Sequence, residues 1–156
     1  MSFKKRYAGK LARDSGQSFE YFFERRCEAE SIIFIKIPDG CKRIKQGARL
    51  RLIPVATPFD CVITKDSNAV CLDLKTIQTT NFTYSQIKPH QREALSNVGR
   101  SLTAGYLIWF RKIDEVVFFD HKQIAECKSG GSLKPKEGLL LGTLQDMRVD
   151  ILMGLQ

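Results

Sequence analysis

Two short acidic segments of this sequence carry residue types that could hydrolyse a phosphodiester bond. Asp60 ends the segment Pro58-Phe-Asp60, and Asp73 is separated from Lys75 by a single leucine. Two carboxylates and a main-chain carbonyl make an oxygen site that suits Mg²⁺. A lysine two residues further on can orient a water molecule or stabilise the charge that develops on the phosphate. This combination of residues indicates metal-assisted hydrolysis.

The elements around these residues are expected to bring them together. Residues 58–64 and 69–75 read as strands joined by a turn at 65–68, which predicts a hairpin. Alternation along a strand puts Asp73 and Lys75 on one face, and the partner strand contributes Asp60. Charges beside apolar sequence are costly unless they are paired or bind a metal. Taken alone, a D-x-K triplet is very common and more often forms a surface ion pair.

Two further polar residues could reach the same site. Glu20 follows Phe19 in a predicted helix of about residues 15–30, which Asp14 or Ser15 can cap. It is either a further metal ligand or a solvated helix residue. Gln91 lies in the first turn of a helix expected between Pro89 and Gly99. Its amide could hold the attacking water or a phosphate oxygen, or it could help to cap the helix.

The remaining pattern predicts one α/β domain over residues 1–156, with a mixed central sheet. The expected order is helix, strand, hairpin, helix, strand. Further strands are predicted at 31–37, 50–55, 104–110 and 116–119, loops at 38–49 and 76–87, a short helix from Asp120 to Glu126, and a flexible basic loop at 128–138. Residues 1–13 are expected to form a basic arm, and the apolar tail from Leu139 to pack on the body or on a partner chain.

The charge of the chain favours a polyanionic partner. There are 25 Lys and Arg against 17 acidic residues, a net charge of +8, and cations that neutralise phosphates release counterions. The expected phosphate contacts are Lys42, Arg43, Lys45, Arg49 and Arg51. No apolar run reaches membrane-spanning length. Five cysteines without a CxxC pair indicate free thiols in a reducing cytoplasm, and two histidines disfavour a Cys/His zinc site.

Taken in order, five segments resemble the PD-(D/E)xK nucleases, and among them the RecU-like Holliday junction resolvases. The resemblance covers roughly residues 15–120, and its specificity lies in the ordered set. The segments are Gly16-Gln-Ser-Phe-Glu20, Pro58-Phe-Asp60, Leu72-Asp-Leu-Lys75, Ile87-Lys-Pro-His-Gln91 and Gly105-Tyr-Leu-Ile-Trp-Phe110. Two features depart from the family. The usual E-x-K is D-x-K here, and residues 38–55 are shorter than the stalk with which RecU proteins bind junctions.

This resemblance implies a restriction-endonuclease-like core and cleavage of branched DNA with Mg²⁺ or Mn²⁺. Asp60, Asp73 and the Leu74 carbonyl would be metal ligands, with Glu20 acting directly or through water. Lys75 would orient the attacking water, and Gln91 would position water or the phosphate. A junction has two strands to cut, so a homodimer is expected. The compact archaeal and phage resolvases are an alternative relative. A restriction-type or nicking nuclease and a catalytically silent DNA-binding module are alternative functions.

Overall fold

A mixed six-stranded sheet forms the centre of the computed structural model, which describes residues 18–47 and 49–152. The strand order is β1-β4-β5-β7-β8-β10; β5 and β7 are parallel and all other neighbours are antiparallel. The strands of this sheet are β1 (Ile33–Lys36), β4 (Cys61–Lys65), β5 (Asn68–Ile77), β7 (Thr103–Phe110), β8 (Glu115–Asp120) and β10 (Leu139–Gly142). The predicted α/β class with a mixed central sheet is therefore confirmed.

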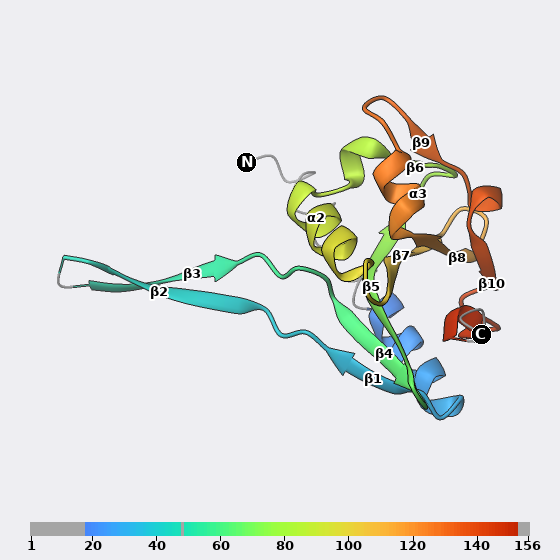
Figure 1. The fold of residues 1–156 in the computed structure, drawn as a ribbon, viewed down its shortest axis with the longest axis horizontal. Coiled ribbons are helices and arrows are strands. Elements are labelled where there is room, and N and C mark those ends of the chain that lie inside the picture. Colours follow the sequence, from blue (N-terminus) through green and yellow to red (C-terminus); the bar gives the residue numbers. More distant parts are fainter. Residues whose placement is uncertain (1–17, 48, 153–156) are drawn as a thin grey trace.

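Helices cover both faces of the sheet (Figure 1). On one face, a helix over residues 18–29 packs Phe19, Phe23 and Cys27 into a core that also includes Leu72 of β5. On the other face lie α2 (Pro89–Val98) and α3 (His121–Glu126), with Leu95 and Ile124 in a second core. Because β5 alternates between the two faces, Val70 and Leu72 point to the first core, and Cys71 and Asp73 point towards α2.

The predicted hairpin and the two capped helices are confirmed. In the β4–β5 hairpin, Cys61 pairs with Leu72 and Lys65 with Asn68. Pro89 begins α2, and Gly99 ends it. Asp120 caps α3 by accepting a hydrogen bond from the backbone N–H of Lys122. The start of the first helix and the basic arm at 1–13 lie outside the described residues. The hairpin and α2 together place the ends of β4, β5 and α2 beside one another.

The prediction of a loop at residues 38–49 is wrong. Residues Gly40–Gln46 form β2, which pairs along its whole length with β3 (Arg49–Val55). This two-stranded ribbon projects from the body between β1 and β4 (Figure 1). Polar residues with few apolar neighbours suggested a loop, but a regular antiparallel ladder satisfies the backbone polar groups of the segment without a core. The short strand predicted at 50–55 is confirmed as β3.

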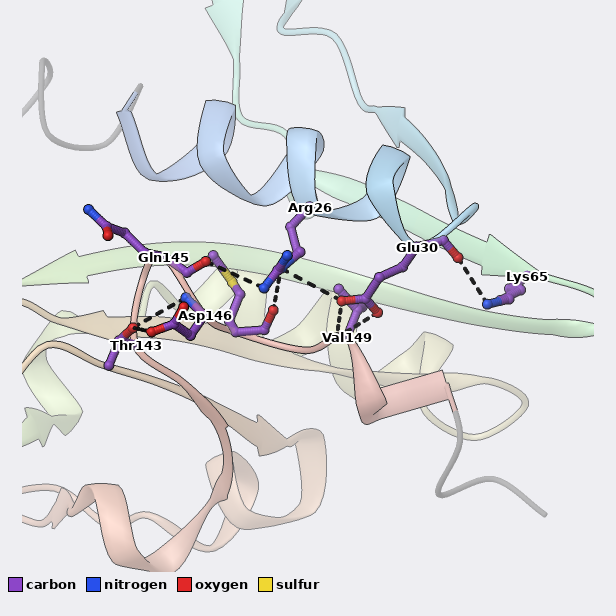
Figure 2. A network of polar contacts seen from close by, with 8 residues as sticks. Arg26, Glu30, Lys65, Thr143, Gln145, Asp146 and Val149 are labelled. Carbon is purple, nitrogen blue, oxygen red and sulfur yellow. Dashed lines mark hydrogen bonds and ion pairs between the residues drawn. The ribbon is translucent and has the colours of Figure 1, made fainter.

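The C-terminal segment 143–152 packs on the same sheet face as the first helix. Met147, Val149 and Ile151 are buried in that core. Arg26 donates to the backbone carbonyls of Met147 and Gln145, and the carboxylate of Glu30 accepts from the N–H of Val149 at 3.1 Å (Figure 2). The expectation that the tail packs on the body is met by these residues. The segment is called the C-terminal strap below.

Smaller elements replace two of the predicted loops. Residues 76–87 contain β6 (Phe82–Thr83) and the 3-10 helix η1 (Tyr84–Gln86), and the basic segment 128–138 contains β9 (Ser132–Leu133) and η2 (Pro135–Glu137). β6 pairs with β9, so these two segments support each other. A last 3-10 helix, η3, spans Asp150–Leu152. Within residues 18–47 and 49–152, no helix has the length and apolarity needed to cross a bilayer. All five cysteines are free thiols.

Candidate active site

Asp60 is fixed at the point where the chain enters β4. Its backbone N–H donates to the carbonyl of Leu72 at 3.0 Å, and its own carbonyl accepts from Ile37 at 2.8 Å. Its side-chain Oδ2 accepts from the backbone N–H of Leu74 at 2.7 Å. The carboxylate of Asp60 therefore reaches across the hairpin to the residue between Asp73 and Lys75, as the hairpin geometry predicted.

Asp73, Lys75 and Gln91 form a closed triangle of side chains. The Lys75 ammonium lies 2.5 Å from Asp73 Oδ2 and donates to Gln91 Oε1 at 3.1 Å. The Gln91 amide N–H donates to the other oxygen of Asp73. Asp73 and Gln91 are buried, while Lys75 is partly exposed. The interpretation of Asp73 and Lys75 as an exposed ion pair is thus excluded, because the carboxylate has no contact with solvent.

Burial controls the protonation of both carboxylates. It raises the pKa of Asp73 to about 7, although the nearby Lys75 charge acts in the opposite direction. Burial also raises the pKa of Asp60 above its ordinary value, against the lowering effect of the Leu74 hydrogen bond and of Lys75. The charge of Asp60 contributes to the raised pKa of Asp73. Two interacting acids are therefore concentrated at one end of the hairpin.

Glu20 lies near these acids but is engaged elsewhere. Its carboxylate forms an ion pair with Lys36 at the end of β1, and this contact raises the pKa of the lysine. The charge of Glu20 contributes to the raised pKa of Asp60, so the two carboxylates interact electrostatically. The structure thus places Glu20 at the border of the site, and its predicted part as a ligand remains a prediction.

A cleft beside the base of the ribbon opens onto these residues. Asp60, Leu74, Lys75 and Gln91 line one side, joined by Lys88 and His90 at the start of α2. The other side is formed by the ribbon base, at residues 39–41 and 55–57. A second cleft lies at the opposite end of β5 and β7, around Asn68, Thr103 and His121, and it contains none of the predicted catalytic residues. The first cleft is accordingly the candidate active site.

The five predicted phosphate-contact residues all lie on the projecting ribbon. Because cross-strand partners share a face, Arg43 and Lys45 lie on one face and the other three on the opposite face. Each face also carries exposed aliphatic side chains, such as Leu50, which is 75% exposed. The five cations are Lys42, Arg43, Lys45, Arg49 and Arg51, all exposed. Both faces of the ribbon are therefore cationic.

The buried carboxylate of Asp73 and the half-buried carboxylate of Asp60 fit a hard divalent cation. Mg²⁺ typically takes one or two carboxylates and completes its shell with water and substrate oxygens. Asp73 Oδ2 has no hydrogen-bond partner in the described structure, because its contact with Lys75 is an ion pair without hydrogen-bond geometry. Among residues 18–47 and 49–152, no three His, Cys, Asp or Glu side chains are grouped to hold a metal ion. The protein thus offers two acidic ligands where three side chains were predicted.

Three side chains of the site were not assigned a part from the sequence. Lys88 lowers the pKa of both Asp60 and Asp73, and Lys36 pairs with Glu20. Tyr106 of β7 lies in register with Asp73, with its ring centroid 5.7 Å from the Lys75 ammonium. Lys88 directly precedes Pro89, so the predicted helix start could have located it. The positions of Lys36 and Tyr106 depend on strand pairing, which no local pattern reveals.

These observations define a restriction-endonuclease-like α/β fold with a candidate acidic site at the end of its hairpin. Among solved structures, the chain is similar to the Holliday junction resolvase Hjc of the archaeal hyperthermophile Archaeoglobus fulgidus. The TM-score is 0.56 at 14% sequence identity, over 80% of this chain and 95% of that one. No family model and no curated protein matches the sequence. This likeness establishes the fold. The similar structure is an archaeal resolvase, a group that was considered from the sequence as an alternative to the RecU-like proteins.

Proposed function

We propose that this protein is a metal-dependent endonuclease that resolves four-way DNA junctions. The observation that carries the proposal is the meeting of Asp60, Asp73, Lys75 and Gln91 at one cleft, on a fold shared with a Holliday junction resolvase. Burying an acid so completely is costly, and stability alone gives no reason to place it beside a second acid. A catalytic use of the pair accounts for that cost.

Each residue of the site would have a separate role in the reaction. Lys75, with its ammonium between Asp73 and Gln91, would orient the attacking water and offset the negative charge that develops on the phosphate. Gln91 holds both Asp73 and Lys75 through the two ends of its amide, so it would position this pair in addition to any contact with water or phosphate. Lys88, at the mouth of the cleft, would attract the phosphodiester.

Asp60 and Asp73 would hold Mg²⁺ or Mn²⁺, with the Leu74 carbonyl and, directly or through water, Glu20. When bound, such an ion supplies Lewis-acid polarisation of the phosphate and an activated water. The hydrogen bond from the Leu74 N–H to Asp60 fixes one carboxylate, and the Gln91 amide fixes the other. Both ligands would therefore be held in place by the protein before a metal arrives, which lowers the cost of ordering them.

The projecting ribbon supports branched DNA as the substrate. It carries five exposed cations and emerges beside the candidate active site, so DNA held by the ribbon would pass the cleft. It also lies between β1 and the strand that begins after Asp60, the position in which RecU-like resolvases carry their stalk. We therefore propose a RecU-like mode of junction binding on this shorter ribbon.

The proposal is tested by incubating the protein and Mg²⁺ with equimolar four-way junction, nicked duplex and linear duplex. We expect paired symmetric nicks in the junction alone. Asp73→Asn and Lys75→Ala should each reduce cleavage by about 1000-fold or more, while junction binding stays within about threefold, because the ribbon supplies the phosphate contacts. Lys112→Ala, which removes an exposed lysine outside the cleft, is the matched control.

Three results would contradict parts of this proposal. Degradation of linear duplex with no preference for the junction would assign the same site to a restriction-type or nicking nuclease. Binding of the junction without cleavage, with Mg²⁺ or Mn²⁺ present, would assign the chain to the DNA-binding modules. Full activity of the Asp73 or Lys75 variant would remove the assignment of the catalytic residues.

A further inference from the structure

Tyr106 is a fully buried aromatic residue directly beside the candidate catalytic lysine. It is 0% exposed and pairs in register with Asp73 across the parallel strands β5 and β7. Side chains in register across neighbouring strands lie on the same face. Since Asp73 and Lys75 are two residues apart, all three side chains are on the face that α2 covers.

The ring of Tyr106 has the geometry of a seat for the Lys75 ammonium. The nitrogen lies over the ring at 5.7 Å from its centroid, within the range of a cation–π contact. The ring itself is fixed by Phe82, whose centroid lies 5.6 Å away. With Asp73 Oδ2 and Gln91 Oε1, the ring is the third group that contacts the ammonium from a separate direction.

The hydroxyl of Tyr106 is not what keeps this residue in place. It is buried and has no hydrogen-bond partner, and the burial and the nearby Asp73 charge raise its pKa. A buried hydroxyl without a partner makes no hydrogen bond that could hold Lys75. The contact of Tyr106 with Lys75 is made by its ring.

We propose that Tyr106 is a positioning residue, whose ring face holds the Lys75 ammonium against Asp73 and Gln91. This inference rests on the proposed function, because Lys75 is the residue that would act on the water and the phosphate. Without the ring, the long side chain of Lys75 keeps its two polar partners but no longer has the surface that limits its movement. A misplacement of the ammonium by about 1 Å can slow a reaction considerably.

The kinetic test compares three variants on the four-way junction with Mg²⁺. Tyr106→Leu, which removes the ring, should lower kcat by about 10- to 100-fold with an unchanged KM. Tyr106→Phe, which keeps the ring, should restore kcat to within about threefold. Phe110→Leu is the matched control, because Phe110 is also fully buried on the same strand but contacts Phe119, and it should retain kcat. A folded Leu variant with wild-type kcat, or a Phe variant as slow as the Leu variant, would overturn the proposal.

A second measurement works without any activity and leaves Tyr106 unchanged. In metal-free protein labelled with ¹³C-lysine, the ε-methylene resonance of Lys75, identified by its disappearance in Lys75→Arg, should be shifted upfield by the ring. A resonance at the position of the exposed lysines would contradict the proposed seat. If the shift is present but no junction is cleaved, the ring seat stands and the proposed function fails, so the two failures are distinguishable.

Discussion

Asp73 is the residue on which most of the site depends, and its environment makes its charge sensitive to pH. Its carboxyl is fully buried, and burial raises its pKa from 3.8 to about 7 in the metal-free protein. A carboxyl with a raised pKa binds its proton more tightly in the folded than in the unfolded state. Its contribution to stability is therefore most favourable below the unfolded value and is lost as the pH rises through about 7.

The loss of this stabilisation with rising pH leads to a prediction for metal binding. A divalent cation binds the ionised carboxylates, so it should stabilise the protein more at pH 8 than at pH 5.5. We expect the melting temperature of the metal-free protein, relative to Asp73→Asn, to fall between pH 4 and pH 7, the interval between the unfolded and the folded pKa of this carboxyl. Addition of 10 mM Mg²⁺ or Mn²⁺, about 100 times a Kd near 0.1 mM, should raise the melting temperature at pH 8.

Thermal unfolding with and without metal at both pH values measures these effects. In Asp73→Asn, the melting temperature should not fall with pH and should lose most of its increase with metal. Asp114 is an exposed aspartate outside the site, so Asp114→Asn should behave as the wild type. An equal gain from metal at pH 5.5 and pH 8 would contradict the part assigned to the buried carboxylates.

The sequence could predict the two acids and the lysine of the site, but not the other residues that contact the site. Alternation within a strand and pairing within a hairpin are local, so the meeting of Asp60, Asp73 and Lys75 followed from residue types and spacing. The ion pair of Glu20 with Lys36 joins a helix to an edge strand, and Tyr106 approaches Lys75 across a parallel pair. Both interactions depend on how distant segments pack, which no local spacing encodes.

The ribbon is the element whose removal should affect DNA binding and leave the fold intact. None of its described residues belongs to either core, and its base lines the cleft. Replacing four of its five cations by glutamine should weaken junction binding. The slope of log Kd against log salt should also flatten, by about 0.9 for each phosphate that the ribbon no longer neutralises. The melting temperature should stay unchanged. The variant carries Lys42→Gln, Arg43→Gln, Arg49→Gln and Arg51→Gln.

The control for the ribbon removes the same charge from other exposed sites. It carries Lys112→Gln, Lys128→Gln, Lys134→Gln and Lys136→Gln. Fluorescence anisotropy at several salt concentrations compares the two variants with the wild type. If the control weakens binding as much as the ribbon variant does, net charge rather than the ribbon carries the affinity.

The C-terminal strap should contribute to stability and not to chemistry. Met147 is 0% exposed and packs with the first helix and the sheet, so Met147→Ala should lower the free energy of unfolding by about 2–4 kcal/mol. Arg26→Ala removes the hydrogen bonds to the strap carbonyls and should cost about 1–2 kcal/mol. Urea titration measures both, with exposed Gln145→Ala near zero as control. A cost below about 1 kcal/mol for Met147→Ala would contradict the buried position of the strap.

The elements that the sequence predicted best are those with a local signal. Pro89 and Gly99 bound α2, Asp120 caps α3, and runs of strong apolar content mark β7 and β8. The ribbon was missed because Lys and Arg are not typical strand residues, and its pairing rests on a backbone ladder with aliphatic side chains on both faces. The place of the strap could not be foreseen either, since its backbone groups bond to Arg26 and Glu30, more than 100 positions earlier.

Residues 18–47 and 49–152 form one candidate active site, whereas a four-way junction has two strands to cut. A two-fold symmetric dimer would present two equivalent sites to a substrate of similar symmetry. Since the strap is buried on its own sheet, the exposed apolar residues include Tyr21 and Phe22 on the first helix and Leu139 and Leu140 on β10. The homodimer remains a prediction, and Leu139 and Leu140 belong to the apolar tail that the sequence predicted to pack on the body or on a partner chain.

A mixed dimer separates paired action of two sites from independent action of each. Wild-type chains and Asp73→Asn chains with different tags are co-expressed, and the heterodimer is isolated by two affinity steps. On a supercoiled plasmid with an extruded cruciform, two wild-type sites should nick both strands within one binding event and give linear product. The heterodimer has one working site and should give nicked circles, at about half the rate of the first cut.

A heterodimer of wild-type and Lys112→Ala chains should still give linear product. Cleavage by a species that sediments as a monomer, or linear product from the Asp73→Asn heterodimer, would show that the two cuts do not require two sites held together.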